Sequence, residues 1–311
     1  MSTHIEYSSK DKAFAIFYAI LISLIFVGHY FIAKDVMKEV PPLILGAARG
    51  IIGGPLIFLF IRTPIKKHIN KKLLLNLVAI GFLGFFLNQI LFLYGLKNTT
   101  ALKTSLFINA IPIITTFLGI VFAQEEFTYK KVIGVSLGFI LVSILVFQKG
   151  GDLSSISING DLLIFLSVVS LCLSFVIAKK IMTGNMPNVL VSTGMLVTGG
   201  IMLLIPSIMD TPLFLEYTFS NFKNFSYMFY EIVISSSVTY YLNFKVLQVL
   251  APSQSTIFIY IQPPLTALCE FLLFSIVPSP IILPIFIGIL FSGYLVISKN
   301  KKRALRPLSI E

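Results

Sequence analysis

Seven side chains that can donate or accept hydrogen bonds lie within long apolar stretches of this sequence. They are one imidazole, four carboxamides and two phenols: His29, Asn88, Asn109, Asn243, Gln262, Tyr240 and Tyr260. Polar groups are costly in hydrocarbon, so they tend to face the interior of a helix bundle. The chemistry that they predict is hydrogen bonding to a polar solute. Alternatively, the amides join neighbouring helices, and the tyrosines fill space.

His29 and Arg49 lie deep enough in these stretches for a charge on them to need a partner or a function. His29 titrates near neutral pH and can carry a proton, or it can contact lipid headgroups at the interface, which we favour. Arg49 needs a partner at its depth. We favour an ion pair or a carbonyl contact for Arg49 over contact with a solute.

Three charged groups lie near the ends of apolar stretches. Lys245 is expected to extend to the surface; if it points inward beside Asn243, it favours an anionic group. Glu270 is interpreted as a charge at a pore mouth, with pairing to a lysine or a coupling role as alternatives. Glu125 is expected to pair with Lys130 or Lys131, or to cap the next helix.

Three prolines interrupt apolar stretches: Pro112, Pro263 and Pro264. We interpret them as kinks that act as hinges; alternatively, they expose backbone carbonyls to a solute. Motifs of intramembrane proteases, zinc hydrolases and phosphate-binding loops are absent from the sequence. We therefore expect that the chain is not an enzyme. We also expect no catalytic residues, no metal ligands and no cofactor.

The elements that carry these residues are membrane-spanning helices. The chain has 311 residues, of which 56% are hydrophobic and 12% charged, and its apolar runs reach the length that crosses a bilayer. Ten spans are predicted, at residues 13–33, 41–61, 72–96, 102–122, 130–148, 160–181, 189–209, 226–249, 251–275 and 281–298. The predicted fold class is an all-α integral membrane protein.

Lysines and arginines concentrate in alternate loops, on the side of the amino terminus. Because such residues are retained in the cytoplasm, both termini are predicted to be cytoplasmic. The net charge of +11 indicates topology and contact with anionic lipid, and not a nucleic-acid partner.

The sequence also repeats itself. Ile32-Ala33-Lys34 recurs as Ile177-Ala178-Lys179, and Asn109 to Pro112 is answered by Tyr260 to Pro263. Five spans in each copy would make the second copy enter the membrane from the opposite side. We expect an inverted pair of repeats, 1–150 and 151–299, followed by a basic cytoplasmic tail, 300–311.

The order of several short motifs resembles a known family. They are Leu87-Asn88-Gln89, Tyr94-Gly95-Leu96-Lys97, Pro112, Glu125 and Gly134, followed by Gly160-Asp161-Leu162-Leu163 and Tyr260 to Pro263. In this order the chain resembles the EamA type of the drug/metabolite transporter (DMT) superfamily. It departs from the family at Gln262 and Ile276, where a carboxylate is common. The resemblance implies a central cavity lined by spans one, three, four, six, eight and nine.

The expected function is that of a secondary-active transporter of a small polar metabolite, working by alternating access. An amino acid, an amino-acid derivative or a nucleoside-type compound is expected as substrate. A membrane scaffold or lipid-binding subunit is the alternative, followed by an intramembrane enzyme. We expect a multi-pass protein of a bacterial inner membrane, monomeric or homodimeric, with membrane lipids as its other partners.

Overall fold

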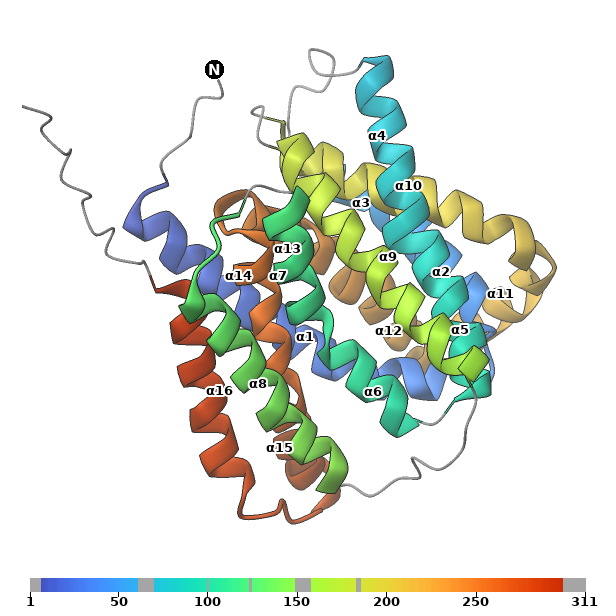
Figure 1. Ribbon diagram of the computed structural model, residues 1–311. Coiled ribbons are helices and arrows are strands. Elements are labelled where there is room, and N and C mark those ends of the chain that lie inside the picture. Colours follow the sequence, from blue (N-terminus) through green and yellow to red (C-terminus); the bar gives the residue numbers. More distant parts are fainter. Residues whose placement is uncertain are drawn as a thin grey trace, which may run out of the picture.

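The computed structural model describes residues 7–60, 70–99, 101–122, 125–148, 158–182 and 186–298. Within these ranges the chain forms helices and no strands (Figure 1). The basic tail 300–311, most of the lysine-rich loop after the second span, and the predicted repeat boundary at residue 150 lie outside the described residues.

Eight helical stretches are long and apolar enough to cross a membrane. They are Ser9–Val36, Pro42–Leu59, Lys71–Leu96, Lys103–Phe122, Tyr129–Gln148, Asn159–Met182, Asn188–Ser220 and Pro252–Phe274. Ile282–Ile297 is a shorter apolar helix. The described helices also cover the predicted span at 226–249, but this stretch is not among the eight. The all-helical membrane fold is confirmed, and the count of ten spans stays a prediction.

Several spans consist of more than one helical segment. The first half of the described chain comprises α1 (Ser9–Val36), α2 (Pro42–Ile51), α3 (Gly53–Phe60), α4 (Lys71–Gly81), the π-helix η1 (Phe82–Leu87), α5 (Asn88–Asn98), α6 (Ala101–Asn109), α7 (Ile111–Phe122) and α8 (Tyr129–Gln148).

The second half begins with α9 (Ile158–Met182) and α10 (Asn188–Ser207). After these come the 3₁₀ turn η2 (Ile208–Asp210), α11 (Thr211–Ser220), α12 (Phe222–Phe229), the π-helix η3 (Tyr230–Val238), α13 (Thr239–Val249), α14 (Pro252–Thr256), the 3₁₀ segment η4 (Ile257–Ile261), α15 (Gln262–Phe274) and α16 (Ile282–Ile297).

Helices far apart in the sequence pack side by side. α2 packs along α10, α5 along α9, and α8 along α16, the last pair at the left of Figure 1. Small residues allow the first of these contacts: a Cβ atom on Gly50 would lie 2.6 Å from the Cα of Gly200. In the bilayer, where lipid is as apolar as leucine, such close backbone packing is a main source of helix association.

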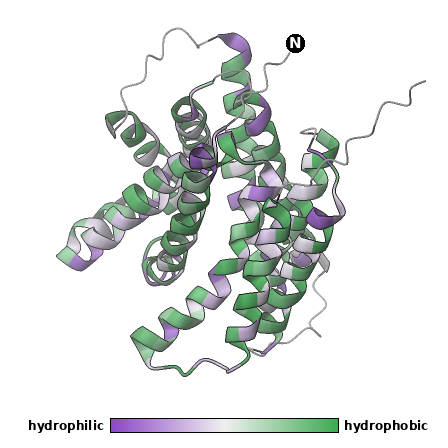
Figure 2. Ribbon diagram, turned by 90° about the vertical axis from the view of Figure 1, so that its left-hand side faces the viewer, coloured by the Kyte–Doolittle hydropathy of each residue, from purple (hydrophilic) through white to green (hydrophobic). Residues whose placement is uncertain are grey.

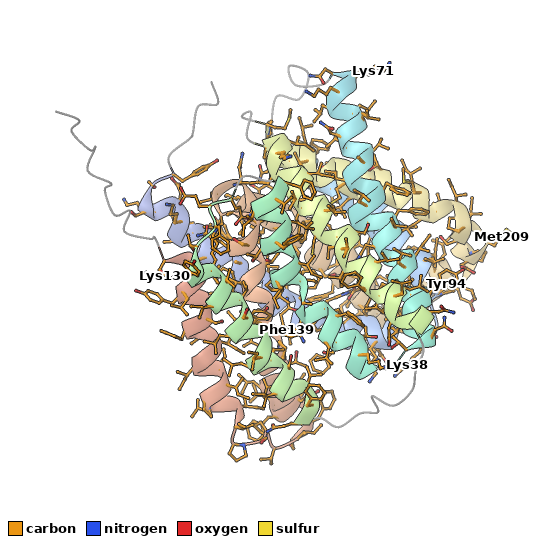
Figure 3. All side chains as sticks on the ribbon, in the orientation of Figure 1. Lys38, Lys71, Tyr94, Lys130, Phe139 and Met209 are labelled. Carbon is orange, nitrogen blue, oxygen red and sulfur yellow. The ribbon has the colours of Figure 1, made fainter. Side chains whose placement is uncertain are left out.

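The outer surface is apolar. Large side chains such as Leu59, Leu75 and Ile205 are exposed, and hydrophobic residues dominate the helices in Figure 2. A water-soluble monomer rarely exposes so much apolar surface, so lipid is the medium that fits this one. Lys71, at the start of α4, lies at the top of Figure 3, and Lys38, beyond the end of α1, lies in the lower right of the picture. Which end faces the cytoplasm stays a prediction.

Candidate functional site

A cavity of about 250 Å³ lies inside the bundle. Its walls come from α1, α2, η1, α5, α6, α7, α9, α13, α14, η4 and α15, so all six spans expected to line a cavity contribute to it, together with the second span. The predicted candidates on its lining are His29, Arg49, Asn88, Tyr240, Asn243 and Gln262. We call this space the central cavity.

Irregular helix geometry precedes the polar residues of the cavity. The π-helix η1 ends immediately before Asn88, and the π-helix η3 ends immediately before α13, which carries Tyr240 and Asn243. The two π-helices occupy corresponding places in the predicted repeats. A π-helix replaces the ordinary bonds to the fourth residue with bonds to the fifth and often marks a functional site.

The proline positions are also irregular. The helix is interrupted by a turn at Ala110, before Pro112, and the 3₁₀ segment η4 precedes Pro263 and Pro264. These distortions lie where kinks were expected. Whether they move as hinges stays a prediction.

Asn88 contacts a neighbouring helix as well as the cavity. Its Nδ2 donates to the backbone oxygen and the Oγ of Ser167 in α9, each at 3.0 Å. The interhelical role considered for this amide is therefore present in the structure. A substrate contact at Asn88 stays a prediction.

A buried cluster of ionisable groups lies beside the cavity, centred on Glu231 of η3. The Glu231 carboxylate is fully buried, and its Oε2 lies 2.7 Å from His29 Nδ1 and 3.8 Å from Arg49 Nε. Ser235 Oγ donates to the same oxygen at 3.2 Å, and Arg49 Nε donates to Ser236 Oγ at 2.7 Å. Arg49 thus has the ion-pair partner that its depth required, and His29 contacts a carboxylate inside the bundle.

Glu231 was missed in the sequence. The signal was available, because an acid inside an apolar span is costly and usually functional, and Glu231 lies within the predicted span 226–249. It lies close to the start of that span, however, where an interfacial position is equally compatible with the sequence.

A second cavity, of about 520 Å³, adjoins the first. Asn109 and Glu270 line this outer cavity and not the central one, so the two candidate amides Asn88 and Asn109 lie on different cavities. Tyr30 and Gln262 line both cavities, and Tyr30 OH donates to Gln262 Oε1 at 2.6 Å. This hydrogen bond lies at the boundary between the two spaces.

Two predicted residues lie away from both cavities. Tyr260 is fully buried, its hydroxyl donates to the backbone oxygen of Val135 at 3.0 Å, and its ring contacts Gly138, where a Cβ atom would clash. The amino group of Lys245 lies 4.9 Å from the centre of the Tyr18 ring. In this structure Tyr260 packs between helices, and Lys245 contacts an aromatic ring.

Glu125, in the connection before α8, bonds to residues of α8 and α14. Its Oε2 accepts a bond of 2.9 Å from Lys131 Nζ, its Oε1 accepts one of 3.0 Å from the Ser253 backbone nitrogen, and the Ser253 hydroxyl also donates to it. The expected pairing with Lys131 is confirmed. Within the described ranges, no group of three His, Cys, Asp or Glu side chains is placed to hold a metal ion.

Comparison with known proteins gives the family. The model of the EamA-like transporter family matches residues 13–147 and 158–299. A solved structure shares the fold, with a TM-score of 0.75 at 15% sequence identity, over 93% of this chain and 97% of that chain.

Three curated relatives are similar at low identity. An uncharacterized transporter of Bacillus subtilis, YyaM, is 28% identical over 49% of this chain and 50% of its own length. An S-adenosylmethionine/S-adenosylhomocysteine transporter of Chlamydia muridarum is 27% identical over 51% of each chain. A second Bacillus subtilis transporter, YetK, also uncharacterized, is 22% identical over 81% of this chain and 77% of its own.

The match thus spans about half the length of the first two relatives. The apolar helices of the chain and its similarity to these transporters show that it is a multi-pass membrane protein. In bacteria, the inner membrane is the usual location of such proteins. The division into inverted repeats at residue 150 stays a prediction. By its family match the chain belongs to the EamA-like transporter family.

Proposed function

We propose that this chain is a secondary-active carrier that moves a small polar metabolite across the membrane by alternating access. The substrate classes are an amino acid, an amino-acid derivative or a nucleoside-type compound. The central cavity is the binding site, with Asn88, Asn243 and Gln262 as hydrogen-bonding groups.

The observation that carries this proposal is the composition of the central cavity. Its volume of about 250 Å³ is just below the range of about 300–1,000 Å³ that is usual for small-molecule sites, so the solute is small. Its walls are mostly apolar, with a few amide and charged groups, which is the usual composition of a site that orients a ligand.

The position of the cavity supports alternating access. Both predicted repeats contribute to its lining, and transporters of inverted repeats bind their substrates at the repeat interface. The hydrogen bond between Tyr30 and Gln262 at the boundary with the outer cavity is of a kind that can open and close.

One relative supports the choice of substrate class. The Chlamydia muridarum protein is named for S-adenosylmethionine and S-adenosylhomocysteine, which combine an amino acid with a nucleoside. Its similarity covers half of each chain, so the class and not the compound is proposed here.

Counterflow in liposomes tests the function. The full chain is reconstituted into vesicles preloaded with one unlabelled compound, and uptake of the same compound in labelled form is followed against protein-free vesicles. The panel contains amino acids, nucleosides and S-adenosyl compounds. We expect transient accumulation of at least one compound.

The main alternative, a membrane scaffold or lipid-binding subunit, predicts no exchange of any compound. Absence of exchange across the whole panel, with protein that is monodisperse and correctly inserted, would favour that alternative.

A further inference from the structure

The guanidinium of Arg49 is held in one orientation by contacts on its Nε edge. Nε donates to Ser236 Oγ at 2.7 Å, and Ser236 Oγ donates to the backbone oxygen of Glu231 at 2.7 Å. Glu231 Oε2 lies 3.8 Å from the same nitrogen. Both partners come from the π-helix η3, so this segment fixes the direction in which the guanidinium points.

The opposite edge of the guanidinium is accessible from the central cavity. Arg49 is only 7% exposed, and it lines this cavity. Within the described part of the chain, Nε is the guanidinium nitrogen that donates a hydrogen bond to protein. In the same part of the chain, two side-chain atoms are fully enclosed and lack a hydrogen-bond partner, Thr115 Oγ1 and Glu231 Oε1. Neither of them belongs to Arg49. Nη1 and Nη2 are therefore not sealed off.

Two parallel N–H donors on a fixed planar group match the two oxygens of a carboxylate. Bidentate pairs of this kind are among the stronger and more directional hydrogen bonds in proteins, and arginine suits them better than lysine. In a partly enclosed cavity with mostly apolar walls the interaction is also less screened than in bulk water.

The remaining walls define what such a ligand carries besides its anionic group. Phe26, Phe85 and Phe258 offer apolar surface, whereas Asn243 and Gln262 offer hydrogen bonds. Glu231 does not line the cavity and lies on the Nε side, so it balances the charge of Arg49 without occupying the edge that faces the ligand.

We propose that Arg49 is the subsite for the carboxylate of the transported compound, and that the substrate is a small monocarboxylate with an apolar part, a class that includes amino acids and 2-oxo acids. This proposal rests on the proposed carrier function. It narrows the substrate classes to those with a free carboxylate.

Matched ligand pairs test the subsite. The detergent-purified full chain is titrated with 4-methylpentanoate and 4-methylpentanamide, with leucine and leucinamide, and with phenylalanine and phenylalaninamide. Binding is measured from the concentration dependence of thermal stabilisation, since a ligand of the folded state raises its stability. For the wild type we expect at least one carboxylate to bind about tenfold more tightly than its amide.

Three variants assign that preference to Arg49. Arg49→Gln combined with Glu231→Gln removes both charges, so no buried charge is left alone, and the preference is expected to disappear. Arg49→Lys keeps the positive charge but removes the two parallel N–H donors, so it is expected to weaken the preference. It replaces the double variant in this test if the double variant does not fold. Lys38→Gln removes an exposed positive charge and is expected to keep the preference. Gel filtration and the melting temperature without ligand verify folding.

Two results would overturn the proposal: a folded double variant or Arg49→Lys variant that keeps the full preference, or a wild type that prefers no carboxylate in any pair. Counterflow distinguishes a failure of the subsite proposal from a failure of the proposed carrier function. Exchange of an uncharged compound without carboxylate preference leaves the carrier and rejects the subsite. Arg49-dependent binding of a carboxylate without any exchange supports the subsite and rejects the carrier.

Discussion

Replacing Glu231 with glutamine tests the buried charge cluster most sharply. The Glu231 side chain is fully buried and the Arg49 side chain is only 9% exposed, so little water can replace a lost partner. Removing one partner of a buried pair typically costs about 3–5 kcal/mol, because the other charge stays behind uncompensated. We expect Glu231→Gln to lower the free energy of unfolding by an amount in this range.

The double variant Arg49→Gln, Glu231→Gln provides the control. With both charges removed, the cost is expected to fall to about 1.5 kcal/mol or less, because no charge is left alone. The two single variants and the double variant form a cycle whose coupling energy measures the pair. Unfolding is followed by titration with sodium dodecyl sulfate from a mild detergent. A loss below about 1 kcal/mol in Glu231→Gln, or additive single effects, would refute the cluster as described.

Two other sites give independent predictions. Tyr30→Phe removes the hydrogen bond to Gln262, which is worth about 0.5–1.5 kcal/mol. Backbone amides at the boundary between the two cavities should then exchange hydrogen faster in nanodiscs. Unchanged exchange would contradict the idea that this hydrogen bond closes the boundary. Glu125→Gln breaks the nearly buried pair with Lys131 and should lower the free energy of unfolding by about 3 kcal/mol. Glu126→Gln, at an exposed neighbour, should change it by less than about 0.5 kcal/mol, and equal effects of the two changes would contradict the pairing.

Most of the helical architecture could be predicted from the sequence. In hydrocarbon, every backbone N–H and C=O group needs an internal partner, so a long apolar run has few options other than helix. Each of the ten predicted runs overlaps a described helical stretch. The break before Pro112 was foreseeable for a similar reason, because proline removes a helix hydrogen bond.

The site was predicted less completely, because the distance along a helix gives depth and not direction. Tyr260 was predicted to face a solute because it lies within an apolar span, but η4 has 3₁₀ geometry, with about 3.0 residues per turn in place of 3.6. Over a few residues this difference turns a side chain to another face, and Tyr260 packs against Gly138. The π-helix η1, which precedes Asn88, changes the direction of side chains in the opposite sense.

The buried cluster needed the tertiary structure. Arg49 could be recognised as a charge that requires a partner, but Glu231 is 182 residues farther along the chain, and one sequence gives no measure of proximity between them. Only the packing of α2 against η3 brings them together.

The central claim, that a small solute crosses through the central cavity, is tested most directly by filling that cavity. Asn243 lines it, and Asn243→Phe adds bulk without a new charge. In counterflow with the compound that the wild type exchanges, we predict that Asn243→Phe lowers the initial rate at least about tenfold, whereas Lys38→Gln keeps it. Equal rates in the wild type and in a folded Asn243→Phe variant would contradict the account.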